Sequence, residues 1–143
     1  MIYVSATNRK LTEKYVDWAI KGLPGSKKLQ PTEILQKTDA NKVVMFGVLR
    51  GTHLVYRWAE KNKIDFYYID RPYWGETRNS PYYVKIVKNN HLKNWQEKRP
   101  DDRFKKSFPW PIHPWKKNGK NIIVCPPSNA MAKFFQVENW LDN

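Results

Sequence analysis

Three loops of this sequence gather residue types that could bind or transform a ligand. The first is Arg50-Gly51-Thr52, which His53 follows at the expected start of a helix. Because a helix begins with free N–H groups and the positive end of its dipole, this loop predicts a phosphate site, to which Arg50 adds charge. A glycine and a hydroxyl residue before a helix are equally typical of a plain cap with no ligand, so both interpretations stay open.

The second loop is Asp70-Arg71-Pro72-Tyr73-Trp74-Gly75, which follows an apolar run. Two large aromatic residues in a constrained turn suit stacking on a base or a sugar ring, and Asp70 could accept hydroxyl hydrogen bonds or act as a general base. The alternative is structural: Tyr73 and Trp74 cover the edge of a sheet and Asp70 pairs with Arg71.

The third loop, Pro126-Pro127-Ser128-Asn129, again precedes an expected helix. Ser128 and the neighbouring amides could contact a diphosphate, or Ser128 could simply cap the helix. Cys125, just before this loop, has no histidine beside it, and we expect a buried structural thiol.

Composition narrows the chemistry further. The single cysteine excludes an intramolecular disulfide and a cysteine-based zinc cluster, and the three histidines lack metal-ligand spacing, so we expect neither a metal nor a cofactor. The 26 Lys and Arg residues against 13 Asp and Glu give a net charge of +13. That charge attracts polyanions such as nucleic acid, nucleotide phosphates or acidic glycans, but it is also compatible with a merely solvated surface.

The elements that must position the first two loops form the clearest pattern. Val43 to Val48 is an apolar run typical of a strand buried on both faces, and a helix with Leu54, Val55, Trp58 and Ala59 on one face follows it. A second buried strand runs from Ile64 to Ile69. This order predicts a right-handed βαβ unit in a Rossmann-like, mostly parallel α/β sheet, with Arg50 and Asp70 at the same rim.

Flanking elements complete the predicted domain. A strand over residues 2–5 precedes a helix that ends by Gly22, with Leu11, Tyr15 and Trp18 on its apolar face; a short helix over residues 32–36 and a strand over 82–87 follow. We expect residues 1–90 to form the Rossmann-like domain and 91–120 a basic, proline-rich connector. Residues 121–143 are expected to form a buried strand, Ile122 to Cys125, and a helix with Met131, Phe134 and Phe135 on one face. That unit either packs on the same core or begins a truncated second domain.

The chain has no apolar run long enough to span a membrane and no secretion signal at its start. These features favour a cytoplasmic protein without a membrane partner.

Three strings of the sequence carry a resemblance to a known group. They are Tyr67 to Gly75, Tyr82 to Ile86 and Ile122 to Ser128. Together they resemble bacteriophage proteins similar to GT-B glycosyltransferases, which typically show a tyrosine-rich strand, an Asp-His-Gly-like turn and a strand ending in a Pro-Pro-Ser-like loop. The similar region spans about Val43 to Phe135, and Arg71 stands where those proteins typically carry the histidine.

The resemblance implies a transferase that moves a sugar from a nucleotide-sugar donor to a DNA or polysaccharide acceptor. Arg50, Gly51 and Thr52 would line the acceptor side with Asp70, Arg71, Tyr73 and Trp74. Ser128 and Asn129 would approach the donor phosphates, and Asp70 would deprotonate the acceptor hydroxyl. Another copy of the chain, or a separate subunit, could supply the missing half of the second domain. The competing hypothesis is a non-catalytic basic α/β module that binds nucleic acid or a host protein.

Overall fold

The computed structural model describes residues 1–7, 10–71, 84–91, 111, 113–114, 117–121, 123–137 and 139. The chain divides into two compact units, Met1–Glu97 and Lys98–Asn143, and each is described by itself. The further division of the second unit into a connector and a strand–helix part stays a prediction.

The first unit is built on a five-stranded sheet with the strand order β2-β1-β3-β4-β5. All neighbouring strands pair in parallel except β4 and β5, which pair antiparallel. This arrangement confirms the Rossmann-like, mostly parallel α/β class. The strands are β1 (Ile2–Ser5), β2 (Lys27–Leu29), β3 (Lys42–Phe46), β4 (Asp65–Asp70) and β5 (Lys85–Lys88).

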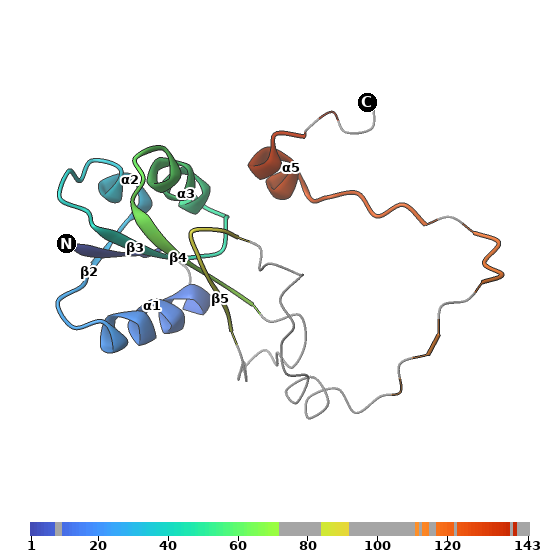
Figure 1. Ribbon diagram of the computed structural model, residues 1–143, viewed down its shortest axis with the longest axis horizontal. Coiled ribbons are helices and arrows are strands. Elements are labelled where there is room, and N and C mark those ends of the chain that lie inside the picture. Colours follow the sequence, from blue (N-terminus) through green and yellow to red (C-terminus); the bar gives the residue numbers. More distant parts are fainter. Residues whose placement is uncertain are drawn as a thin grey trace. The chain divides into compact units, whose positions relative to one another are not determined.

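Helices cover both faces of this sheet (Figure 1). Helix α1 (Lys10–Gly22) packs on β1, β2 and β3, whereas α2 (Pro31–Ile34) and α3 (Thr52–Lys61) contact each other on the opposite face. Right-handed crossovers dictate this split, because the chain moves one way from β1 to β2 and the other way from β2 through β3 to β4.

The predicted βαβ unit is confirmed. Three consecutive residues of β3, Val43 to Met45, are all buried, as expected for a strand with a helix layer on each face. Helix α3 seals one face with Val55, Tyr56 and Ala59, and β4 follows directly.

The apolar faces of the helices differ in detail from the predicted ones. In α1 the buried row includes Thr12, Tyr15 and Val16, and Trp18 is 46% exposed. Leu54 of α3 is also exposed, because the buried row of that helix passes through Val55 and Tyr56 instead. On each helix, apolar residues at i, i+3 and i+4 spacing form two overlapping rows. Only one of the two rows can face the sheet.

Strand β2 was not predicted from the sequence. It has three residues, Lys27, Lys28 and Leu29, and both lysines are exposed at the edge of the sheet. Short, lysine-rich edge strands resemble loops in composition, since their role is to pair on one side while discouraging pairing on the other.

In the second unit, α5 (Asn129–Phe135) confirms the predicted helix. Its N-cap is Ser128, whose Oγ accepts a hydrogen bond from the Met131 N–H at 3.4 Å. Phe134 is buried, and Phe135, expected on the same face, is exposed.

The buried strand predicted just before α5 is wrong for the residues that the structure describes there. Ile123 is 83% exposed, and both Val124 and Cys125 are exposed too, so the prediction of a buried thiol is also wrong. An apolar run forms a strand only when a neighbouring strand satisfies its backbone N–H and C=O groups. The described residues of this unit contain no strand that could do so.

Candidate functional site

The parallel pairing of β3 and β4 brings two of the predicted loops to one rim. Phe46 pairs with Ile69, so the loops that begin at Gly47 and at Arg71 leave neighbouring strands at the same edge of the sheet. The expected shared edge for Arg50 and Asp70 is therefore confirmed. We call this edge, formed by the carboxyl ends of β1, β3 and β4, the carboxyl rim.

The strand order also creates a topological switch point at this rim. From β1 the chain turns to β2 on one side, and from β3 it turns to β4 on the other. The connections that follow β1, after Ser5, and β3, after Phe46, therefore lead in opposite directions, although β1 and β3 are neighbours in the sheet. Such a divergence is where open α/β sheets bind ligands.

The connection from β3 to α3 has an unusual backbone. Gly47, Arg50 and Gly51 all have positive φ, at 65°, 58° and 88°. Arg50 is exposed in this left-handed conformation, which few residues with a Cβ adopt without cost.

The cap of α3 is Gly51, not the hydroxyl of Thr52 as the sequence had indicated. Thr52 is almost completely buried, and its Oγ1 donates to the Leu49 carbonyl at 2.8 Å, so this hydroxyl holds the loop together. Because Gly51 has no side chain, no side-chain oxygen of the N-cap accepts a hydrogen bond at the positive end of the α3 dipole. His53 follows in the first turn and is half-buried.

Asp70 ends β4 with its carboxylate held by three neighbours. The Tyr68 hydroxyl donates to Oδ2 at 2.7 Å, the Arg71 backbone N–H donates to Oδ1 at 2.8 Å, and Lys85 Nζ lies 3.9 Å from Oδ2. The side chain of Asp70 is 35% exposed. A carboxylate has about four acceptor positions, so this one is oriented by the protein and still accessible to a donor from a ligand.

Lys85 is the site residue that sequence reasoning missed. It pairs with Asp70 across the antiparallel β4–β5 ladder, its side chain is 12% exposed, and its Nζ lies 5.5 Å from the centre of the Tyr68 ring. The only signal in the sequence was the predicted strand at 82–87. The antiparallel direction of that strand, which the sequence did not reveal, is what brings Lys85 to the carboxyl rim.

Aromatic residues support this cluster on the α3 face of the sheet. Tyr56 of α3 packs edge-on against Phe66 and Tyr68, and its hydroxyl lies 3.5 Å from His91 Nδ1. Burial raises the pKa of Tyr56 to about 12, helped by the negative charge of Glu60. Burial and then the charge of Lys85 lower the pKa of His91, so the imidazole favours its neutral form.

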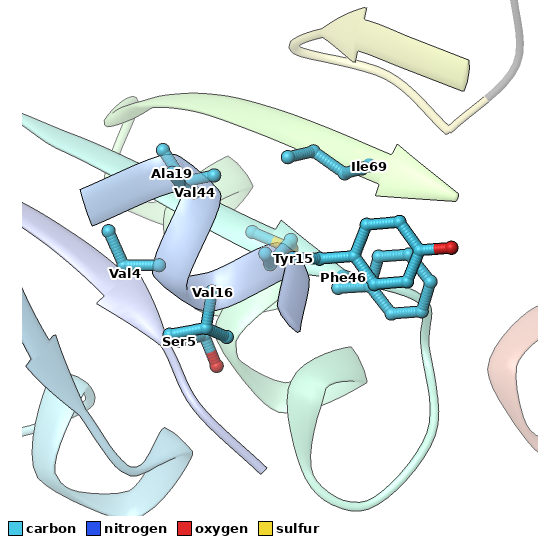
Figure 2. Close-up of a pocket in the computed structure, with 9 residues that line it drawn as sticks. Val4, Ser5, Tyr15, Val16, Ala19, Val44, Phe46 and Ile69 are labelled. Atoms are coloured by element: carbon cyan, nitrogen blue, oxygen red, sulfur yellow. The ribbon is translucent and has the colours of Figure 1, made fainter. Parts of the chain in front are cut away.

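On the α1 face, a small hollow of about 10 Å³ lies between α1 and the sheet (Figure 2). The ring of Tyr15 stacks on Phe46 with centroids 4.2 Å apart, as Figure 2 shows, and Ile69 lines the hollow beside them. Ser5 also lines it, and its hydroxyl is buried without a hydrogen-bond partner in the part of the chain that the structure describes. The hollow has room for about one water molecule, so it is not a ligand cavity.

The remaining predicted site residues are Tyr73, Trp74, Ser128 and Asn129. Tyr73 and Trp74 lie outside the described residues. Ser128 and Asn129 belong to the second unit, where they begin α5.

Comparison with protein-family models, curated proteins and solved structures finds no match for this chain. Among the described residues, no helix is long and apolar enough to cross a membrane. Nor do three His, Cys, Asp or Glu side chains of that same part of the chain gather into a metal site.

Proposed function

We propose that this protein is glycosyltransferase-like and that the carboxyl rim of its first unit receives the hydroxyl of an acceptor, either modified DNA or a polysaccharide. The observation that carries the proposal is the oriented carboxylate of Asp70, which ends β4 at the same rim from which the β3–α3 connection leaves β3. Asp70 keeps acceptor capacity for a ligand hydroxyl, and the positive end of the α3 dipole together with Arg50 favours negative charge at the rim.

In the proposed reaction, the acceptor oxygen bonds to the anomeric carbon of the sugar while the bond from that carbon to the diphosphate oxygen breaks. The hydroxyl proton passes to Asp70, and the diphosphate leaves with its negative charge. Helix amides and basic side chains stabilise that charge in this proposal.

The donor side of the proposal rests on the sequence resemblance and on Ser128 and Asn129. Ser128 Oγ accepts a hydrogen bond from Met131, and the hydroxyl keeps its own hydrogen to donate to a phosphate oxygen.

Ligand binding to the full-length protein tests the proposal first. A ligand that binds only the folded state raises the melting temperature, so UDP-glucose, other nucleotide sugars and UDP alone should be compared by thermal shift. We expect at least one nucleotide sugar to raise it. If none does at millimolar concentration, the transferase proposal is wrong.

The Asp70→Asn variant tests the role of the carboxylate. It keeps the size of the side chain and one acceptor oxygen but cannot take a proton, so transfer to an acceptor should fall by about a hundredfold or more. The matched control is Asp65→Asn, because Asp65 also pairs with a β5 lysine, Lys88, but at the opposite end of β4. Equal turnover in the Asp70→Asn variant and wild type would remove Asp70 from the mechanism.

A further inference from the structure

The outward face of α1 carries a row of basic residues with one exposed tryptophan. Lys10, Lys14, Trp18 and Lys21 are spaced four, four and three residues apart, which is the spacing of neighbours along one side of a helix. All four are exposed, and together we call them the α1 stripe. The buried side of the helix, with Tyr15 and Val16, faces the sheet.

The acidic residues of α1 do not cancel the charge of the stripe. Glu13 and Asp17 lie beside it, and Lys28 of β2 is 3.5 Å and 3.9 Å from their carboxylates. This lysine partly neutralises both, since exposed ion pairs of this kind are weak but still local. The stripe therefore presents a net positive charge.

Trp18 is held in place while its ring remains accessible. Tyr15 packs edge-on against it with centroids 5.5 Å apart, and Tyr15 is itself fixed by stacking on Phe46 of β3. Lys14 Nζ lies 4.9 Å from the centre of the Trp18 ring. The indole is 46% exposed, so a preoriented aromatic surface lies next to a cation that can pair with a phosphate.

We propose that the α1 stripe binds single-stranded nucleic acid, with a base stacked on Trp18 and the phosphates paired with Lys10, Lys14 and Lys21. An exposed aromatic ring among regularly spaced cations matches this ligand, since stacking needs an accessible base face and the backbone needs positive charge along its length. Duplex DNA offers no such face except at its ends. This site is separate from Asp70 and does not depend on the transferase proposal.

Fluorescence anisotropy of a labelled oligothymidylate with the full chain tests the stacking. Trp18→Ala should weaken binding about tenfold, and Trp18→Phe should retain most of the affinity because it keeps a ring. Leu54→Ala removes an equally exposed apolar side chain from α3 and should leave affinity unchanged. Wild-type affinity in Trp18→Ala, or no binding by the wild-type protein at low salt, would overturn the proposal.

A series of NaCl concentrations tests the charges. Because each phosphate contact to a single strand contributes about 0.7 to the slope of log affinity against log salt, Lys14→Ala/Lys21→Ala should make the slope shallower by about 1.4. The control pair Lys27→Ala/Lys61→Ala removes the same charge from β2 and α3. An equal change of slope in both double variants would mean that net charge alone attracts the strand. Equal affinity for a duplex would exclude stacking. Either result contradicts the proposal.

Discussion

Asp70 illustrates how the surroundings of a residue change the chemistry that its type suggests. One of the two interpretations of the sequence paired it with Arg71, the next residue along the chain. In the structure its ion pair is with Lys85 on the neighbouring strand, and Arg71 contributes its backbone N–H. These contacts orient the carboxylate, so a ligand hydroxyl would meet an acceptor already in place.

The two glycines with positive φ in the β3–α3 connection should differ in how they tolerate a side chain. At Gly51 an added Cβ would lie 3.3 Å from Pro31 Cβ, whereas at Gly47 no atom of the described residues would lie within 4 Å of it. Gly47→Ala should therefore cost only the left-handed conformation, about 1 kcal/mol of unfolding free energy, and Gly51→Ala measurably more. Urea denaturation of both variants measures this, and equal losses would contradict the close approach to Pro31.

His91 should make stability depend on pH in the mildly acidic range. Its pKa is lowered in the folded state, chiefly by burial and then by Lys85, with Glu60 opposing. The unfolded chain therefore binds a proton more readily, and stability should fall as pH drops through the ordinary histidine pKa of about 6.5 to the folded value.

Urea denaturation of wild type and His91→Gln at several pH values isolates this effect. The difference between the two proteins should shrink or reverse as pH falls, because Gln cannot gain a proton. Parallel pH profiles for both proteins would show that His91 is not responsible.

At the level of single residues, the sequence predicted those whose positions follow directly from a strand. Arg50 and Asp70 were assigned correctly to one rim because each follows a buried parallel strand. Lys85 was not recognised as a site residue, because its position depends on the direction of a distant strand. Gly51 was expected in the loop, but its role as the left-handed N-cap of α3 depends on a backbone angle and was not predicted.

Among the elements, the edge strand β2 shows how charge protects an open sheet. Its two lysines are exposed, and β2 pairs with β1 on one side only, so a further strand could otherwise pair with its open side. The variant Lys27→Val/Lys28→Val should therefore promote self-association through this edge. Light scattering coupled to gel filtration measures it, and a mass unchanged from wild type at every concentration would contradict this role.

The short helix α2 is anchored by two buried side chains, Pro31 and Ile34. Ile34 is completely buried, and four residues of helix are too few to be stable alone. Ile34→Ala should lower the unfolding free energy by about 2–5 kcal/mol, whereas Leu54→Ala on the exposed side of α3 should cost about 0.5 kcal/mol or less. Chemical denaturation compares them, and a small loss at Ile34 would mean that α2 packs loosely.

Two elements show why sequence patterns fail in opposite directions. Strand β2 looks like a loop because its edge position calls for lysines, and residues 123–125 look like a strand because they are apolar. Whether a segment becomes a strand depends on a partner that supplies hydrogen bonds, and hydropathy does not encode the partner. The strand β3, apolar and buried on both faces, was predictable because burial alone decides it.

At the scale of the whole molecule, the positive charge is unevenly distributed. Residues 85–120 contain eleven of the 26 basic residues and three of the 13 acidic ones, while the first unit adds the α1 stripe on one helix layer. The carboxyl rim and the α1 stripe lie on different parts of the first unit, so sugar transfer and strand binding should respond to different variants. Asp70→Asn should spare oligothymidylate affinity, and Trp18→Ala should spare any thermal shift with a nucleotide sugar.

An amide NMR titration of the full-length protein with candidate acceptors, a short modified DNA and an oligosaccharide, shows where the acceptor binds. We predict shift changes at the carboxyl rim, at residues 47–53, Asp70, Arg71 and Lys85, with little change at the opposite ends of β3 and β4, around Lys42 and Asp65. Changes concentrated at those opposite ends, with the rim unaffected, would rule out the carboxyl rim as the acceptor site.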